Sequence, residues 1–222
     1  MGRVTVSDWW LRLVRFGFYL LYNQLAWTYD FVSWIVSLGE WRRWQFAALP
    51  FVKGRKVLEI AHGTGHLLQA MQHAGHHVIG LDLSPYMSRI AQRGTDNIPL
   101  LQASALRLPF PNAQFDTVVT TFPTSFILEL DTLNAIRRCL KPTGRLLVVP
   151  EGHLLGGSLI HQLIAWLFRI TGQQMEAATV WDDWHTQFAA AGFELTIHNV
   201  KLSRSAVTVL IGRPIYFGES HR

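Results

Sequence analysis

The chain has 222 residues, of which 49% are hydrophobic and 16% charged, and its formal net charge is +5 at pH 7. This composition excludes an intrinsically disordered chain, and the length suits one domain with a sizeable core. A single cysteine, Cys139, excludes an internal disulfide framework, and its place in a helix-like run predicts a buried structural thiol. The arginines form scattered pairs and no long basic run, which argues against binding to nucleic acid.

The N-terminal region reads as helical, with helices expected at about 8–25, 29–38 and 40–49. In the first of these, polar residues spaced three and four apart form one narrow stripe, and the rest of the surface is apolar. The longest uncharged run, 16–29, is shorter than the roughly 20 residues that a spanning helix needs. We therefore expect no transmembrane span and no export signal, and an apolar face covered by core, partner or lipid.

Strands alternate with helices through the middle of the chain. Apolar runs predict strands at about 55–60, 77–82, 98–103, 114–122 and 144–149, and helices at about 65–74, 84–94 and before Leu140. In the second helix we expect Ser84 as the N-cap, Pro85 as the first helical residue and Gly94 just past the end. A turn is expected between the helix that ends near Leu140 and the following strand.

The last third continues the pattern and closes with a hairpin. An apolar helical run at 154–170 precedes a helix with Thr179 as the expected N-cap and Gly192 as its stop. Two strands, 193–200 and 205–212, are close enough to pair antiparallel. The sequence therefore predicts an α/β fold with a Rossmann-like, doubly wound sheet that is mostly parallel and has an antiparallel strand near one edge.

The stretch "VLEIAHGTGHLL", residues 57–68, ends a strand on two glycines before a helix begins. Gly63 and Gly65 are typical of a loop that holds a nucleotide-like ligand, although they could be turn glycines of any Rossmann-like fold. The third glycine of G-x-G-x-x-G is missing, which disfavours a nicotinamide-dependent reductase, and no P-loop motif is present. Asp82 ends the next strand, where a carboxylate can accept both ribose hydroxyls or, alternatively, cap the following helix.

The ordered series "VLEIAHGTGHLL", "VIGLDLSPYM", "QASALRLPFPNAQFDTVVT" and "LKPTGRLLVV" resembles the class I S-adenosylmethionine-dependent methyltransferases. Within them it looks most like the branch of the ubiquinone and menaquinone C-methyltransferases, and the resemblance covers about residues 30–150 well. It implies S-adenosylmethionine as the cofactor. It also implies a helical cap or lid over 1–50 and a methyltransferase domain over 51–222, with an inserted apolar helix at about 154–170.

The resemblance assigns cofactor contacts residue by residue. Glu59 would order the glycine turn and reach the methionine amino group, or serve only to support the loop. Gly63 and Gly65 would let the backbone approach the cofactor, Asp82 would bind the ribose, and Thr121 would offer its carbonyl to the methionine amine. The other implied contacts, at the turn and along the adenine, are Ala61, His62, Leu83, Met87, Ala103, Ser104 and Ala105.

Two residues depart from the family pattern. Ala61 stands where the family usually has glycine, and alanine is compatible with this turn if its φ is negative. Ser104 stands where an aspartate often accepts from the adenine amino group, and a hydroxyl accepts more weakly. Both keep open a second function class, a protein that binds the cofactor without catalysis. His62 and His66 flank the glycines and could contact cofactor or acceptor.

Methyl transfer requires that the nucleophile of the acceptor is aligned with the carbon–sulfur bond and that water is excluded. A base is required only if the acceptor loses a proton. Glu151 and His153 follow the fifth strand and are the candidate bases, with solvated loop residues as the alternative. Trp181 and Trp184 are interpreted as packing residues and, alternatively, as an acceptor cage. We expect a small, lipophilic acceptor, no metal, and a cytoplasmic protein with reversible membrane contact. The acceptor atom and the oligomeric state stay open.

Overall fold

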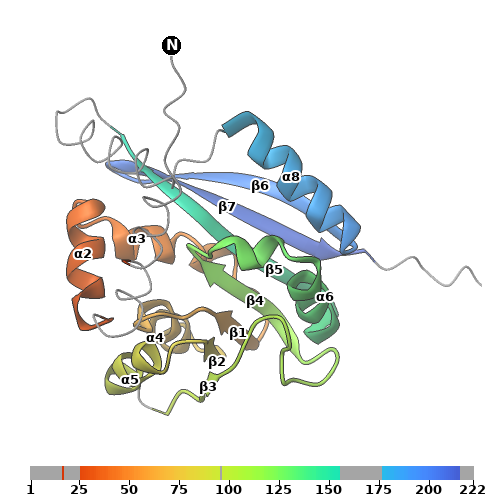
Figure 1. Ribbon diagram of the computed structural model, residues 1–222, viewed down its shortest axis with the longest axis horizontal. Helices are drawn as coiled ribbons and strands as arrows, with labels where there is room; N and C mark the ends of the chain where they lie inside the picture. The colour runs from red at the N-terminus through yellow and green to blue at the C-terminus, as the bar shows by residue number, and fades with distance from the viewer. Residues whose placement is uncertain (1–16, 18–25, 96, 156–176, 216–222) are drawn as a thin grey trace, which may run out of the picture.

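The computed structural model describes residues 17, 26–95, 97–155 and 177–215. The helix expected at 8–25 (apart from Gly17) and residues 156–170 of the helix expected at 154–170 lie outside the described residues, and Leu154 is instead the last residue of strand β5. Seven strands form one sheet in the order β3-β2-β1-β4-β5-β7-β6 (Figure 1). Their bounds are β1 Lys56–Ile60, β2 His77–Asp82, β3 Leu100–Gln102, β4 Phe115–Thr121, β5 Leu140–Leu154, β6 Phe193–Lys201 and β7 Ser205–Pro214.

The sheet confirms the expected fold class. The pairs β3-β2, β2-β1, β1-β4 and β4-β5 are parallel, whereas β7 runs antiparallel to both of its neighbours. The expected hairpin is thus present, with β6 at the edge and the antiparallel strand one position inside it. The helical elements are η1 Ala26–Thr28, α2 Tyr29–Val36, α3 Trp41–Phe46, η2 Leu49–Phe51, α4 His66–His73, α5 Pro85–Gly94, η3 Ser125–Leu128, α6 Leu130–Cys139 and α8 Ala177–Ala190.

Helix boundaries agree in part with the sequence-based expectations. The Ser84 hydroxyl accepts from the backbone N–H of Met87, and Pro85 begins α5, so the N-terminal prediction is confirmed. Gly94 is instead the last residue of α5, with Thr95 as its cap. The N-cap prediction for Thr179 is also wrong, because α8 already begins at Ala177. Gly192 ends α8 as expected, with a φ of 75°.

The start of β5 differs as well. The expected turn before residue 144 is absent, because β5 begins directly at Leu140, which pairs with Phe115 of β4. A register shift between Phe115 and Thr117 accommodates the extra residues. The long strand therefore reaches past the carboxyl end of β4, where Thr121 pairs with Val149.

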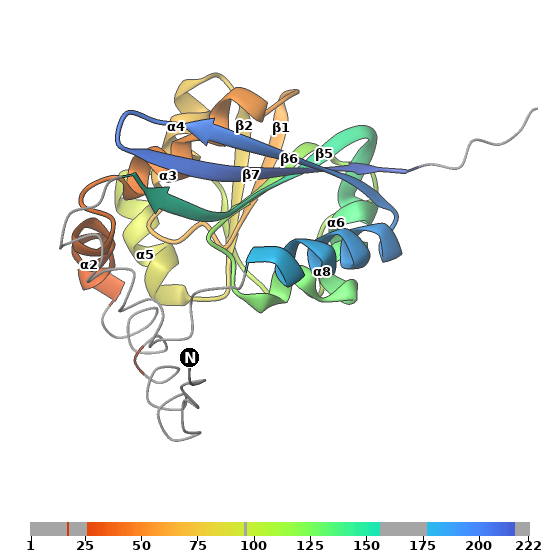
Figure 2. The ribbon, with the colours of Figure 1, turned by 90° about the horizontal axis from the view of Figure 1, so that it is seen from above.

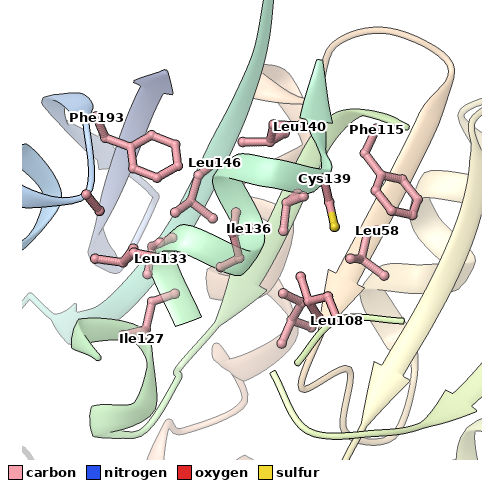
Figure 3. Packing of buried hydrophobic residues seen from close by; sticks show 14 of the residues in the cluster. Leu58, Leu108, Phe115, Ile127, Leu133, Ile136, Cys139, Leu140, Leu146 and Phe193 are labelled. Carbon is pink, nitrogen blue, oxygen red and sulfur yellow. The ribbon is translucent and has the colours of Figure 1, made fainter. Parts of the chain in front are cut away.

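Helices cover both faces of the sheet, as the two ribbon views show (Figures 1 and 2). Alternate strand residues point to opposite faces, so Val57 joins the apolar cluster under α3 and α4, and Leu58 joins the cluster under α6 and α8. Cys139 lies fully buried in the second cluster beside Leu58 and Phe115 (Figure 3). Burial raises the pKa of the Cys139 thiol, which confirms the expected structural role.

Candidate functional site

Sheet register brings the candidate residues to one edge. Glu59 of β1 pairs with Gly80 of β2 on one side and with Val119 of β4 on the other. Ala61, Asp82 and Thr121 each lie two residues further along their own strands, so all three stand at the same level. Ligands of open parallel sheets bind outside these carboxyl ends. The structure thus brings together residues from three separate sequence motifs.

The glycine turn is tied to β2 by a carboxylate. The backbone N–H of Gly63 donates to Oδ2 of Asp82 at 2.9 Å, and that of Ser84 donates to Oδ1 at 2.8 Å. Asp82 therefore supports the start of α5 as well as the turn, and its oxygens retain lone pairs for further donors. A Cβ at Gly65 would lie 2.9 Å from that of Ala91, whereas one at Gly63 would meet no atom within 4 Å.

The backbone of Ala61 contradicts one expectation. Its φ is +56°, in the left-handed region, and not negative. The N–H of Ala61 still donates to the carbonyl of Leu81 at 2.7 Å, so the sheet pairing continues up to the residue where the chain turns sharply. A non-glycine residue in this conformation costs about 1–2 kcal/mol. The alanine thus adopts the glycine conformation at an energetic cost.

Glu59 is completely buried and unpaired. Neither carboxylate oxygen has a hydrogen-bond partner among the residues that the structure describes. Burial, together with the negative charge of Asp82, raises the pKa of Glu59 well above its usual range. An unpaired buried carboxyl is costly, and a cationic or N–H donor bound at this edge would relieve that cost. The residues present therefore fit a cofactor that carries an ammonium group.

His62 packs inward. Its Nδ1 lies 2.9 Å from the carbonyl of Gly63, and because a carbonyl only accepts, Nδ1 carries the proton. A Cβ at Gly80 would lie 2.9 Å from Cδ2 of His62, which places the ring against β2. Burial lowers the pKa of His62, so the imidazole is neutral. Its cofactor contact stays a prediction.

The adenine-side residues differ in accessibility. Leu83 is 71% exposed, as a residue that packs on a ligand would be, whereas Met87 is fully buried. Ala103 and Ala105 are partly buried against the cluster under α6 and α8. The hydroxyl of Ser104 accepts from the N–H of Leu106 at 3.3 Å, so it contributes to its own turn.

The two candidate bases contact each other. Nε2 of His153 lies 2.9 Å from Oε1 of Glu151, on the part of β5 beyond the end of β4. The hydrogen bond to Glu151 outweighs burial and raises the pKa of His153. A Cβ at Gly152, between them, would collide with Trp44, so the pair faces away from α3. Their catalytic role stays a prediction.

Both late tryptophans, Trp181 and Trp184, pack against the apolar cluster under α6 and α8. Trp184 is buried among the residues under α6 and α8, and its ring lies 5.8 Å from that of Phe188, which confirms the packing interpretation for Trp184.

A surface depression lies at the amino-terminal ends of the strands, opposite the candidate site, and is lined in part by His76 and His77. No group of three metal-ligating side chains occurs in the described parts of the chain.

Sequence reasoning missed two residues beside the site. Asp30 of α2 accepts from the Thr64 hydroxyl at 2.8 Å and contacts Nε2 of His66 at 3.0 Å. Phe122, directly after β4, has a φ of +50° and stacks on Trp41 with ring centroids 4.1 Å apart. No local pattern marks either contact, because the partners lie tens of residues apart in the sequence.

Comparison with known proteins agrees with this geometry. Residues 57–144 match the model of a methyltransferase domain family. A demethylmenaquinone methyltransferase of Renibacterium salmoninarum is 31% identical over 137 residues, which are 60% of this chain and 58% of that protein. The demethylmenaquinone methyltransferase of Thermus thermophilus is 27% identical over 218 residues, or 85% of this chain and 98% of that protein. The chain thus spans little more than half the length of the first of these relatives.

Solved structures share the fold. A SAM-dependent methyltransferase from Thermotoga maritima superposes with a TM-score of 0.59 at 19% identity, covering 83% of this chain and 94% of that one. A Haemonchus contortus phosphoethanolamine N-methyltransferase, solved with S-adenosylhomocysteine, gives a TM-score of 0.55 at 17% identity, over 80% and 53% of the two chains. Residues 57–144 thus form a methyltransferase domain, and the fold around them is that of the class I S-adenosylmethionine-dependent methyltransferases. The two relatives in sequence are demethylmenaquinone methyltransferases.

Proposed function

We propose that this chain transfers the sulfonium methyl of S-adenosylmethionine to a small lipophilic acceptor with a quinone-type ring. One observation carries the proposal: Glu59 is an unpaired buried carboxyl beside a glycine turn that Asp82 holds in place. The bound cofactor would supply an electrophilic methyl group. Glu59 would hold the amino group of the methionine part, Asp82 would accept from the ribose hydroxyls, and the open side of Gly63 would admit the backbone of the ligand.

An aromatic cluster supports a ring-shaped acceptor. Phe122 stacks on Trp41, whose ring also contacts Tyr29 at 6.1 Å and Trp44 at 6.1 Å. Because Phe122 follows Thr121, this cluster stands beside the carboxyl end of β4, where an acceptor would meet the methyl group. Stacked aromatic side chains suit a planar apolar ring. The two relatives in sequence, both demethylmenaquinone methyltransferases, agree with such an acceptor.

The proton of the acceptor needs a destination if a carbon or oxygen nucleophile is methylated. The Glu151–His153 pair lies past the carboxyl edge of the sheet, and the hydrogen bond to Glu151 stabilises the imidazolium that forms when the neutral ring accepts a proton. The pair points to the face of the sheet opposite the aromatic cluster, so we propose it as the base for an acceptor that reaches across the carboxyl edge of the sheet, with Glu151 orienting the imidazole ring. His153→Gln should lower kcat and change its pH profile, while leaving the affinity for S-adenosylhomocysteine unchanged.

A lipophilic acceptor implies contact with a lipid surface. Trp27, Phe31 and Trp34 are 76%, 64% and 60% exposed, and their spacing places them on one side of η1 and α2. In the described segments, every helix falls short of what crossing a bilayer requires. Aromatic side chains and a net charge of +5 suit a peripheral, reversible contact with anionic lipid. Salt-sensitive binding to phosphatidylglycerol vesicles, lost in Phe31→Ser, tests this part.

Calorimetry tests the cofactor site. Asp82→Ala should weaken S-adenosylhomocysteine binding by about 1–3 kcal/mol, because a charged acceptor is lost. Asp131→Ala removes an exposed aspartate from the first turn of α6, which is not among the residues assigned to the cofactor, and is the matched control. Equal affinities of the Asp82→Ala and wild-type proteins would refute the assignment.

Turnover tests the reaction. Transfer of labelled methyl from S-adenosylmethionine to demethylmenaquinone should be measurable and should depend on Asp82. The alternative, a binder without catalysis, is favoured by Ser104, whose hydroxyl is engaged with the N–H of Leu106. Tight cofactor binding without transfer to any quinone, phenol or amine acceptor would establish that alternative.

A further inference from the structure

The first turn of α2 contacts the glycine turn directly. Asp30 accepts from the hydroxyl of Thr64, which lies between the two turn glycines, at 2.8 Å. Its second oxygen lies 3.0 Å from Nε2 of His66, the first residue of α4. Three side chains thus join the N-terminal cap to the loop that the proposed cofactor would occupy.

The aspartate of this contact is ionised. Burial alone would raise the pKa of Asp30, but the hydrogen bond and charge of His66 and the hydroxyl of Thr64 outweigh it and lower that pKa. Its side chain remains 40% exposed, and that of His66 17% exposed. A half-exposed pair of this kind is worth little as a stability anchor. Its position beside the ligand loop is therefore the more informative property.

Beyond α2 the backbone turns sharply. The turn to α3 contains Leu38 at φ +51° and Gly39 at φ +83°. The far side of that turn is fixed, because Glu40 is buried and accepts from Arg204 and Ser205 of the β6–β7 hairpin. The outer face of α2 is exposed at Phe31 and Trp34. Asp30 thus ties the first turn of α2 to the glycine turn, and Glu40, beyond the other end of α2, ties the chain to the β6–β7 hairpin.

We propose that Asp30 is a positioning residue that closes α2 over the cofactor turn through Thr64 and His66. The proposal rests on the proposed function, because it gives the closed cap a role in acceptor binding. Neighbouring Tyr29 contacts Trp41, which stacks on Phe122 at the acceptor side. A ligand that orders the glycine turn therefore also stabilises the position of α2 and of the aromatic cluster beside it.

Hydrogen exchange measures this coupling without an acceptor. In the wild type, S-adenosylhomocysteine should slow exchange of the amides of α2, and in Asp30→Ala that slowing should be lost. Asp30→Asn should retain it in part, because the amide oxygen still accepts from the hydroxyl of Thr64. Asp131→Ala is the control and should behave as the wild type. Slowing of the same size in Asp30→Ala would overturn the proposal.

Kinetics separates positioning from general stability. Asp30→Ala should raise the KM for demethylmenaquinone roughly fivefold, as for one lost hydrogen bond, with kcat nearly unchanged. Thr64→Val keeps the shape and removes the hydroxyl, so the double variant Asp30→Ala/Thr64→Val should be no worse than Asp30→Ala. Additive effects would contradict the contact.

The two proposals fail in different ways. If the wild type binds no S-adenosylhomocysteine, the proposed function fails. The contact is then tested in the ligand-free protein, where Asp30→Ala should speed exchange in both α2 and residues 62–66. Unchanged exchange in both segments would overturn the role of Asp30 independently of any cofactor.

Discussion

Two buried glutamates in this molecule have opposite surroundings. Glu40, at the N-cap of α3, accepts from Arg43 at 2.9 Å, from Arg204 at 3.0 Å and from the hydroxyl of Ser205 at 3.0 Å. Glu59, at the end of β1, is equally buried and has no partner among the described residues. The paired carboxylate joins the start of α3 to the β6–β7 hairpin, whereas the unpaired one is the residue that we propose for the ligand.

Because their surroundings differ, Glu40 and Glu59 make the stability of the fold depend on pH in opposite directions. Burial raises the pKa of Glu40, but its hydrogen bonds outweigh burial and lower it, so Glu40 stabilises the fold above the ordinary pKa of a glutamate and less as the pH falls. Burial raises the pKa of Glu59, so its contribution is present below the ordinary pKa and is lost as the pH rises through the raised value. The raised pKa of Glu59 is consistent with the role that we propose for it, as the partner of a bound ammonium group.

The largest expected effect is the loss of stability on substitution of the paired residue, Glu40. Glu40→Ala should destabilise the fold by about 2–3 kcal/mol, because three donors lose their acceptor. The two arginine side chains are 58% and 66% exposed and stay hydrated, which limits the loss. Urea denaturation measures it. Arg43→Ala is the control and should cost less than about 1 kcal/mol. If Glu40→Ala lost as little stability as Arg43→Ala, the hydrogen bonds of Glu40 would not distinguish it from the unpaired Glu59.

The next effect is on the unpaired residue. Glu59→Gln should weaken S-adenosylhomocysteine binding by about 1.5–3 kcal/mol, since a charge-assisted hydrogen bond to the amino group becomes a neutral one. Calorimetry at constant pH measures the change. The stability of the ligand-free variant should also lose the fall with rising pH that Glu59 causes in the wild type.

Proton release gives a second test of Glu59. A bound ammonium group favours the ionised carboxylate, so binding should expel the proton that Glu59 holds in the ligand-free protein. Calorimetry in two buffers with different ionisation enthalpies should detect this release in the wild type and not in Glu59→Gln. Identical proton release in both proteins would show that another group titrates.

A smaller effect on stability is expected at Ala61, in the glycine turn that follows Glu59. Ala61→Gly should stabilise the fold by roughly 0.5–1 kcal/mol, because relief of the left-handed conformation exceeds the added entropy of glycine in the unfolded chain. Thermal unfolding measures the change, and Ala103→Gly, in the neighbouring loop, is the control. A less stable Ala61→Gly protein would show that the methyl group contributes packing that outweighs the strain.

The smallest effect concerns the adenine edge. Ser104→Asp should preserve or slightly tighten S-adenosylhomocysteine binding, because a carboxylate accepts more strongly than a hydroxyl and can still accept from the N–H of Leu106. Competition calorimetry against adenosine isolates this end of the ligand. A large loss of affinity would place the 103–105 loop away from the adenine.

The sequence alone determined the elements and the motif order. Apolar periodicity located the described strands other than β5 to within about two residues at each end, since burial on both faces of a parallel sheet requires near-continuous apolar runs. It missed both ends of β5, which is longer than predicted. Gly63, Gly65 and Asp82 were identifiable for a similar reason, because a tight turn and a strand-end carboxylate leave local signatures. The N-cap at Ser84 was readable because capping depends on neighbours a few residues away.

Only the tertiary structure decided how those residues are paired. The positive φ of Ala61 follows from the level at which β1, β2 and β4 end together, and no local preference of alanine indicates it. The partners of Glu40 and the absence of partners at Glu59 likewise depend on which strands become neighbours. Asp30 reaches Thr64 across 34 residues of chain, a separation at which sequence spacing carries no information about contact.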